Sequence, residues 1–248
     1  ATKQYLGAPS HNTFTLLINK QFGSRGRFVM KKIHLLLIYI STIFFFASCK
    51  NSVSEAQKTT GQTVNNYAPR HKDGDVNALI EIPSGTLEKW ELNKLNGKIE
   101  QEFIHKKARI VDYIGYPGNY GLIPKTLLSK EKGGDGDPLD VLVIGPPVAR
   151  GSIIKSKIIG VLFLKDQGEQ DDKLIAVSEK SHFYKLNDIA ELNKNYKGVS
   201  EIIRLWFTNY KGPNKMKSTG FGNKQRAEAI LNTAIQEYKS NTMKAKFD

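Results

Sequence analysis

The chain has 248 residues, 40% of them hydrophobic and 10% aromatic, a composition that excludes a disordered protein and suffices for one sizeable folded core. The formal net charge of +13 at first suggests a nucleic-acid or membrane partner. However, seven of the 37 basic residues and none of the 24 acidic residues lie in the first 50 positions, so about half of the excess charge precedes the expected folded part. The single cysteine, Cys49, excludes an internal disulfide.

Residues 30–49 have the layout of an export signal. Met30 is followed by two lysines, an apolar stretch over residues 33–46, and small residues before Cys49. The stretch is shorter than the roughly 20 residues of a membrane span. The ending resembles the lipobox of bacterial lipoproteins, although Phe46 stands where the lipobox usually has Leu. This resemblance implies lipidation of Cys49; an uncleaved membrane anchor and an ordinary signal peptide remain alternatives.

The chain therefore divides into four expected parts. Residues 1–29 are an upstream extension that precedes a true start at Met30, and residues 30–49 are the signal segment. Residues 50–74 are rich in Ser, Thr, Asn, Gln and Lys, a composition typical of a flexible tether. The folded domain is expected over residues 75–248.

Short runs of β-branched residues, separated by turn residues, predict six strands in the first part of this domain. They cover residues 77–82, 87–92, 109–114, 139–144, 152–164 and 173–177. The apolar spacing then becomes helical. One stripe contains Val199, Ile202, Ile203, Trp206, Phe207 and Tyr210, and another contains Ala227, Ile230, Leu231, Ala234, Ile235 and Tyr238. We expect an α+β fold that is mainly β, with a small closed barrel and C-terminal helices whose stripes, apart from Tyr210, pack on it.

Three carboxylates, Asp135, Asp137 and Asp140, lie within six residues just ahead of an apolar run. Like charges this close raise one another's pKa unless a cation neutralises them, and Mg²⁺ prefers such oxygen ligands. Asp140 would face away from the other two in an extended segment unless Pro138 turns the chain. A solvated acidic turn remains an alternative. An EF-hand calcium loop is excluded because Asp140 and Pro146 stand where it needs Gly and Glu.

A second acidic group lies at residues 165–173, between two predicted strands. Taken alone, this segment is typical of a polar hairpin turn. Together with the first group it indicates a site that could hold several metal ions.

The segment GDGDPLDVLV, residues 134–143, resembles the signature of the family I soluble inorganic pyrophosphatases. The resemblance extends over residues 78–211 in the family's order: LIEIP, KWE, YPGNYG, the second acidic group and a late Tyr-Lys pair. One feature departs from the pattern, because the offset of Arg109 from Tyr116 differs by about one residue. Arg109 could therefore be a strand-surface residue instead. The family has an OB-like barrel, which agrees with the predicted strands.

The resemblance implies hydrolysis of inorganic pyrophosphate to two phosphates by a metal-activated water, with several Mg²⁺ ions in the site. It implies metal ligands at Asp135, Asp137, Asp140, Asp166 and Asp171, and at Glu81 through coordinated waters. Asp137 would also be the catalytic base. The substrate-binding residues would be Lys89, Arg109, Tyr120, Lys173, Tyr210 and Lys211.

Several alternatives remain beside this interpretation. An OB-like barrel on a basic chain could bind single-stranded nucleic acid, but the concentrated aspartates argue against a backbone-binding groove, so we expect no nucleic-acid partner. A related phosphohydrolase acting on nucleotide phosphoanhydrides is the main alternative, and an inactive relative is a further one. Bacterial family members are often hexamers. They are usually cytoplasmic, whereas Cys49 indicates a membrane-anchored lipoprotein, periplasmic or on the outer face.

Overall fold

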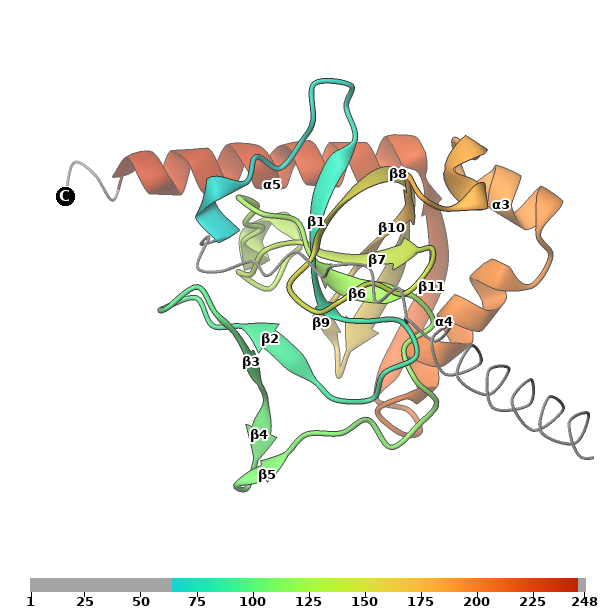
Figure 1. Ribbon diagram of the computed structural model, residues 1–248, viewed down its shortest axis with the longest axis horizontal. Coiled ribbons are helices and arrows are strands. Elements are labelled where there is room, and N and C mark those ends of the chain that lie inside the picture. The colour runs from blue at the N-terminus through green and yellow to red at the C-terminus, as the bar shows by residue number, and fades with distance from the viewer. Residues whose placement is uncertain (1–63, 245–248) are drawn as a thin grey trace, which may run out of the picture. The chain divides into compact units, whose positions relative to one another are not determined.

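The structure is a computed structural model that describes residues 64–244 (Figure 1). The predictions for residues 1–63, including the signal segment and Cys49, lie outside the described residues. Residues 64–74 belong to the predicted tether, but Arg70 donates from Nη2 to Glu228 and, over 3.1 Å, to Asn232 Oδ1. This end of the predicted tether is therefore attached to the C-terminal helix. No helix within residues 64–244 is long and apolar enough to cross a membrane.

The centre of the molecule is a seven-stranded sheet in the order β1-β6-β7-β10-β8-β11, with β9 paired to β8. The strands are β1 (Val76–Ile82), β6 (Asn119–Leu122), β7 (Asp140–Ile144), β8 (Ile153–Asp166), β9 (Glu169–Gln170), β10 (Lys173–Ser178) and β11 (Met216–Asn223). β1 also pairs with β8, over Val76↔Ser156 to Leu79↔Ile153. Strands β1, β6, β7, β10 and β8 therefore form a closed ring, and β7 and β10 are its parallel pair.

Four short strands lie in the chain between β1 and β6. β2 (Trp90–Leu92) pairs with β3 (Ile99–Gln101), and β4 (Phe103–Ile104) pairs with β5 (Lys107–Ala108). We call residues 87–111 the arm; its two ends are joined where the Val111 amide donates to the Leu87 carbonyl at 2.9 Å. Figure 1 shows β2 to β5 beside the large sheet rather than within it.

The helices are the short η1 (Val64–Asn66), η2 (Lys130–Lys132) and η3 (His182–Lys185), then α3 (Ile189–Asn195), α4 (Val199–Asn209) and α5 (Lys224–Lys244). Asp188 caps α3 by accepting from the Ala190 amide at 2.9 Å. Long α5 runs along one side of the sheet (Figure 1) and buries Ala227, Leu231 and Ala234. The prediction that the whole stripe of α4 is covered is wrong at Ile202, which is 57% exposed.

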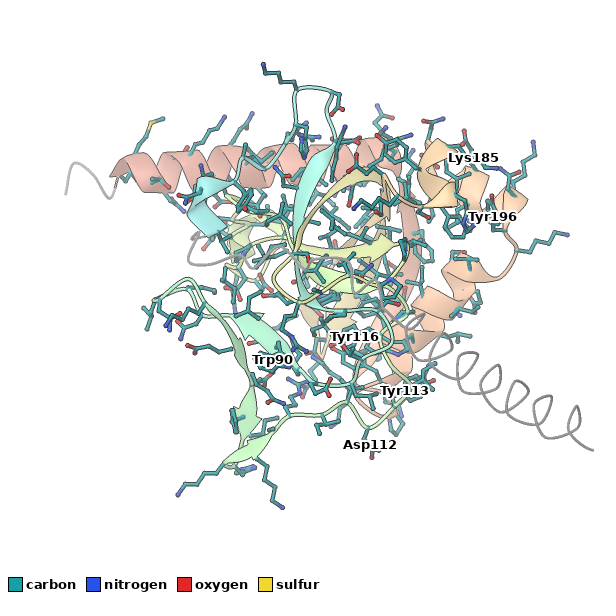
Figure 2. All side chains as sticks on the ribbon, viewed as in Figure 1. Trp90, Asp112, Tyr113, Tyr116, Lys185 and Tyr196 are labelled. Atoms are coloured by element: carbon teal, nitrogen blue, oxygen red, sulfur yellow. The ribbon has the colours of Figure 1, made fainter. Side chains whose placement is uncertain are left out.

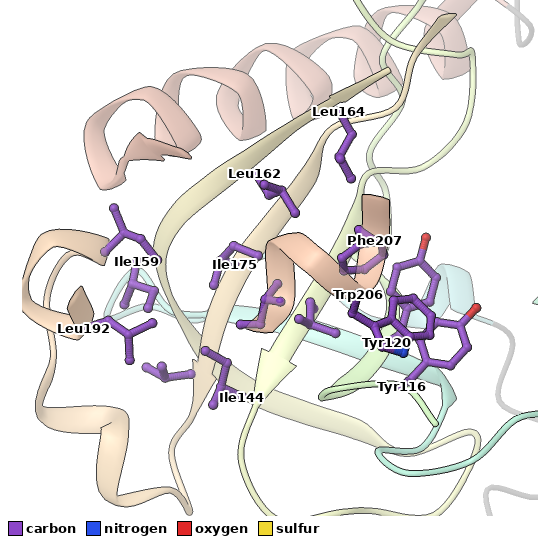
Figure 3. Close-up of a cluster of buried hydrophobic side chains, with 14 of the residues drawn as sticks. Tyr116, Tyr120, Ile144, Ile159, Leu162, Leu164, Ile175, Leu192, Trp206 and Phe207 are labelled. Atoms are coloured by element: carbon purple, nitrogen blue, oxygen red, sulfur yellow. The ribbon is translucent and has the colours of Figure 1, made fainter. Parts of the chain in front are cut away.

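One cluster of buried side chains is aliphatic at one end and aromatic at the other (Figure 3). Ile159, Ile175 and Leu192 lie toward one end, and Tyr116, Tyr120, Trp206 and Phe207 are grouped at the other. Trp206 contacts the Tyr116 ring with centroids 4.4 Å apart, and its indole Nε1 donates to the Ile114 carbonyl at 2.8 Å. The aromatic end of the core is therefore connected through α4 to the chain that follows the arm.

The predicted mainly-β fold with C-terminal helices is confirmed, and β1, β7, β8 and β10 lie where the sequence predicted strands. The predicted strand over residues 109–114 is wrong. β5 ends at Ala108, and residues 109–114 form only the single bridge Glu88↔Ile110. β6 and β11 were not predicted because both contain glycine, which weakens the strand signal.

Candidate active site

A cavity of about 220 Å³ lies between the sheet and the arm. It is lined by Glu81, Lys89, Glu91, Leu92, Lys94, Arg109, Tyr120, Leu122, Asp135, Asp137, Pro138, Asp140, Asp171, Lys173, Tyr210 and Lys211. The sheet and the loop before β7 supply nearly all of the carboxylates, whereas the arm supplies Lys89, Lys94 and Arg109. The cavity therefore has an acidic side and a basic side formed by the arm, and Lys173 and Lys211 are further cations that come from outside the arm.

The acidic loop before β7 brings Asp135, Asp137 and Asp140 to this one cavity, as the sequence predicted. The Asp137 amide donates to Asp135 Oδ1 at 2.9 Å, which fixes the turn. Close packing of the backbone requires a glycine at Gly134, because a Cβ atom there would lie 2.1 Å from the Leu128 carbonyl oxygen. Burial is the main cause that raises the pKa of the Asp135 carboxyl, and the neighbouring Asp140 and Asp137 add to it.

Lysine side chains neutralise these carboxylates. Lys173 is 3% exposed and donates to Asp140 and, at 2.5 Å, to Asp171 Oδ1. Burial alone would lower the pKa of the Lys173 ammonium, but Asp140 and Asp171 outweigh it and hold that pKa above its ordinary value. Lys94 is paired with Asp137. The ammonium groups of Lys173 and Lys94 therefore offset the repulsion among Asp137, Asp140 and Asp171.

The donor set suits a divalent cation, although the lysines would have to move for one to bind. No three His, Cys, Asp or Glu side chains among residues 64–244 are arranged to hold a metal ion. Asp166 does not line the cavity, but its Oδ2 accepts from Lys211 at 2.5 Å while its buried Oδ1 has no hydrogen-bond partner. A buried carboxylate oxygen without a partner is costly, and a hard cation with oxygen ligands would satisfy it.

The basic side is organised by a closed set of backbone hydrogen bonds in the arm. The Lys89 amide donates to the Arg109 carbonyl at 3.0 Å, the Arg109 amide to the Glu102 carbonyl at 2.8 Å, and the Glu102 amide to the Lys89 carbonyl at 2.9 Å. Arg109 Nη1 also donates to both Glu102 carboxylate oxygens at 2.8 Å. Lys89 and Arg109 are therefore presented together, and Arg109 lines the cavity despite its shifted offset.

Tyrosine hydroxyls complete the wall of the cavity. Burial raises the pKa of Tyr120 and of Tyr210 above the ordinary value, so both hydroxyls remain protonated donors at neutral pH. The Tyr120 ring lies 5.7 Å from Lys89 Nζ and 5.8 Å from Lys173 Nζ, within the range of cation–π attraction. Tyr116 does not line the cavity but lies behind Tyr120, with ring centroids 5.4 Å apart.

Glu81 is 5% exposed at the end of β1. Burial raises the pKa of its carboxyl to about 8, an effect that Lys89 reduces and Asp140 increases. Its Oε1 accepts from the Leu92 amide at 2.7 Å, so this carboxylate also contacts the arm. A cation in the cavity would favour the ionised form of Glu81.

The structure thus places every proposed site residue among residues 64–244 at the cavity except Asp166, which reaches it through Lys211. Sequence reasoning missed Glu91 and Lys94. Glu91 lies within the KWE segment and is 2.8 Å from Lys89 Nζ, so the motif contained a signal for it. Lys94 lies in the loop between β2 and β3, and nothing in the sequence distinguishes it from a surface lysine.

The chain is similar to known proteins of one family. The family model described as inorganic pyrophosphatase matches residues 78–239. The inorganic pyrophosphatase of Rickettsia typhi is 38% identical over 169 residues, covering 66% of this chain and 89% of that protein. The Helicobacter pylori enzyme structure superposes with a TM-score of 0.58 at 32% identity, covering 70% of this chain and 98% of that chain.

A type I inorganic pyrophosphatase from P. falciparum gives a TM-score of 0.66 at 26% identity, covering 73% of this chain and 64% of that chain. The family match spans more than half of the chain and includes both sides of the cavity, from β1 to α5. This chain therefore belongs to the inorganic pyrophosphatase family.

Proposed function

We propose that this chain hydrolyses inorganic pyrophosphate to two phosphates in the presence of Mg²⁺. The observation that carries the proposal is the division of one cavity into an acidic side and a basic side. Pyrophosphate is small and strongly anionic, so it needs cations on its oxygens and a base near the attacking water. Lys89, Arg109 and Lys211 supply the cations, and Asp137 supplies the base.

The cavity residues have three proposed roles: metal ligand, catalytic base and donor to phosphate oxygens. Bound Mg²⁺ would supply charge neutralisation and lower the pKa of water, and its ligands would be Asp135, Asp137, Asp140, Asp166 and Asp171, with Glu81 acting through water. Asp137 takes the proton of the attacking water. Lys89, Arg109, Tyr120, Lys173, Tyr210 and Lys211 donate to phosphate oxygens, and Arg109 can make two parallel hydrogen bonds.

Phosphate release from pyrophosphate by the full chain tests this function. We expect phosphate release with Mg²⁺, loss of release on chelation by EDTA, and recovery when excess Mg²⁺ is added. The reason is that the carboxylates are paired with lysines, and Mg²⁺ would have to replace these lysines before the carboxylates can act as its ligands. Nucleoside triphosphates should be poor substrates under the same conditions. Turnover of triphosphates equal to that of pyrophosphate would favour the alternative of a nucleotide phosphohydrolase, and metal-independent turnover would contradict the assigned roles of the aspartates.

We also propose that the enzyme is a membrane-anchored lipoprotein with lipid on Cys49. Residues 30–49 support this by their lysines, apolar stretch and lipobox-like ending, and the cytoplasmic location usual for the family is the alternative. Mass spectrometry of the mature protein is expected to find an N-terminal peptide that starts at a lipid-modified Cys49. An unmodified chain that begins at Met30 and is free in the cytosol would contradict the proposal.

A further inference from the structure

β2 carries part of the basic side of the cavity but is not a strand of the large sheet. Within residues 64–244, its ladder is formed with β3 alone, from Trp90↔Gln101 to Leu92↔Ile99. Lys89 and Glu91 lie on either side of Trp90, and both line the cavity. The position of Lys89 relative to the aspartates of the sheet therefore depends on contacts other than strand pairing.

Arg150 supplies such a contact, because it touches both β1 and β2. It lies in the turn before β8, where the Gly151 amide donates to the Ile80 carbonyl at 2.7 Å and the Ile80 amide donates to the Ser152 carbonyl at 2.9 Å. These two bonds fix the turn to β1. The guanidinium of Arg150 donates through Nε to the Glu81 carbonyl at 3.0 Å and lies over the Trp90 ring, 4.0 Å from its centroid.

Glu81 is consequently connected to β2 in two ways. Its carboxylate accepts from the Leu92 amide at 2.7 Å, and its backbone carbonyl holds Arg150 against Trp90. Trp90 alternates along the chain with Lys89 and Glu91, and unlike them it does not line the cavity. Arg150 does not line the cavity, so it contacts the face of β2 that carries Trp90 and acts from outside the site. Figure 2 shows Trp90 on β2, beside the large sheet.

We propose that Arg150 is a positioning residue, which stacks on Trp90 and thereby holds Lys89 at the distance from the aspartates that pyrophosphate requires. The inference rests on the proposed hydrolysis of pyrophosphate. Without the stack, β2 keeps its ladder with β3 and its bond to Glu81 but loses its lateral contact with the turn before β8. Lys89 then binds the substrate less well, while the carboxylates on the sheet keep their places.

Arg150→Ala tests the proposal. KM for pyrophosphate is expected to rise by about tenfold while kcat stays within about twofold, because a misplaced Lys89 weakens binding and leaves the sheet-borne groups intact. Arg150→Lys, which keeps the charge but not the planar stack, should recover only part of the loss. The matched control is Arg204→Ala, which removes a guanidinium paired with Glu201 on α4 and should leave KM unchanged.

Trp90→Leu probes the same contact from its other side and remains informative if Arg150→Ala folds poorly. It should raise KM like Arg150→Ala, and the double variant should be no worse than either single one, because both remove one interaction. An unchanged KM in the single variants, or additive losses in the double variant, would overturn the proposal.

A readout without turnover separates this inference from the proposed function. The chain has two tryptophans, and Trp206 is 2% exposed, so acrylamide quenching of fluorescence reports mainly on Trp90. Quenching should increase in Arg150→Ala and not in Arg204→Ala. If the wild type fails to hydrolyse pyrophosphate, the proposed function fails, whereas unchanged quenching in Arg150→Ala overturns the stack alone.

Discussion

Asp137→Asn is expected to lower kcat for pyrophosphate by about a thousandfold, the range typical of removing a general base. The side-chain amide of the introduced Asn keeps the shape of the carboxylate and one of its oxygens, so the fold and most of the metal binding should remain. The Asp137 amide donates to Asp135 Oδ1, a backbone contact that the substitution does not alter. The measurement is steady-state phosphate release at saturating Mg²⁺.

Asp112→Asn is the matched control, because Asp112 is exposed, does not line the cavity and undergoes the same chemical change. Its kcat should equal that of the wild type. A near-normal kcat in Asp137→Asn would show that Asp137 is not the catalytic base. A normal kcat with a raised requirement for Mg²⁺ would leave Asp137 as a metal ligand only.

Lys173→Met is expected to destabilise the metal-free protein by about 3–5 kcal/mol, as typically follows when one partner of a buried ion pair is removed. Lys173 is 3% exposed and lies between the carboxylates of Asp140 and Asp171. Its loss leaves two partly buried carboxylates without the ammonium that lies between them. Urea denaturation of the chelated protein measures the change in the free energy of unfolding, and phosphate release should fall as well.

The same variant separates the two ways of neutralising these carboxylates. Because Asp140 and Asp171 would be ligands of Mg²⁺, adding it should stabilise Lys173→Met more than it stabilises the wild type. The control is Lys130→Met: Lys130 pairs with Glu169 at 3.2 Å, with both side chains more than half exposed, and removing it should cost at most about 1 kcal/mol. Equal stabilisation of Lys173→Met and the wild type by Mg²⁺ would contradict the proposed roles of Asp140 and Asp171 as metal ligands.

Of the five aspartates that the sequence proposed for the site, Asp166 does not line the cavity and the other four do. All five could be proposed because they lie in two short segments with distinctive spacing. Asp135, Asp137 and Asp140 meet at one cavity as expected from the turn at Pro138. Asp171 and Lys173 arrive beside them because β10 pairs with β7 in parallel. Such patterns are local in the sequence, so they could be recognised without knowing the fold.

The basic side was less predictable because the arm fixes it by nonlocal contacts. Residues 109–114 suggested a strand, yet Arg109 is placed by single backbone bonds to Lys89 and Glu102. Lys94 is paired with Asp137, 43 positions away in the chain, and the Arg150–Trp90 stack joins the turn before β8 to strand β2. Charge and spacing along the sequence do not encode such distances.

Closure of the strand ring limits strand pairing between copies of the folded protein. β1 is hydrogen-bonded to β6 on one side and to β8 on the other, so it offers no long unpaired edge. Among the strands of the large sheet, β11 ends the path, and α3, α4 and α5 all contact it. Exposed strand edges promote intermolecular pairing and fibril growth. We therefore expect the large sheet of the native domain to resist edge-to-edge aggregation, and its β1 edge to be a hazard only in chains in which β1 has not yet joined β8.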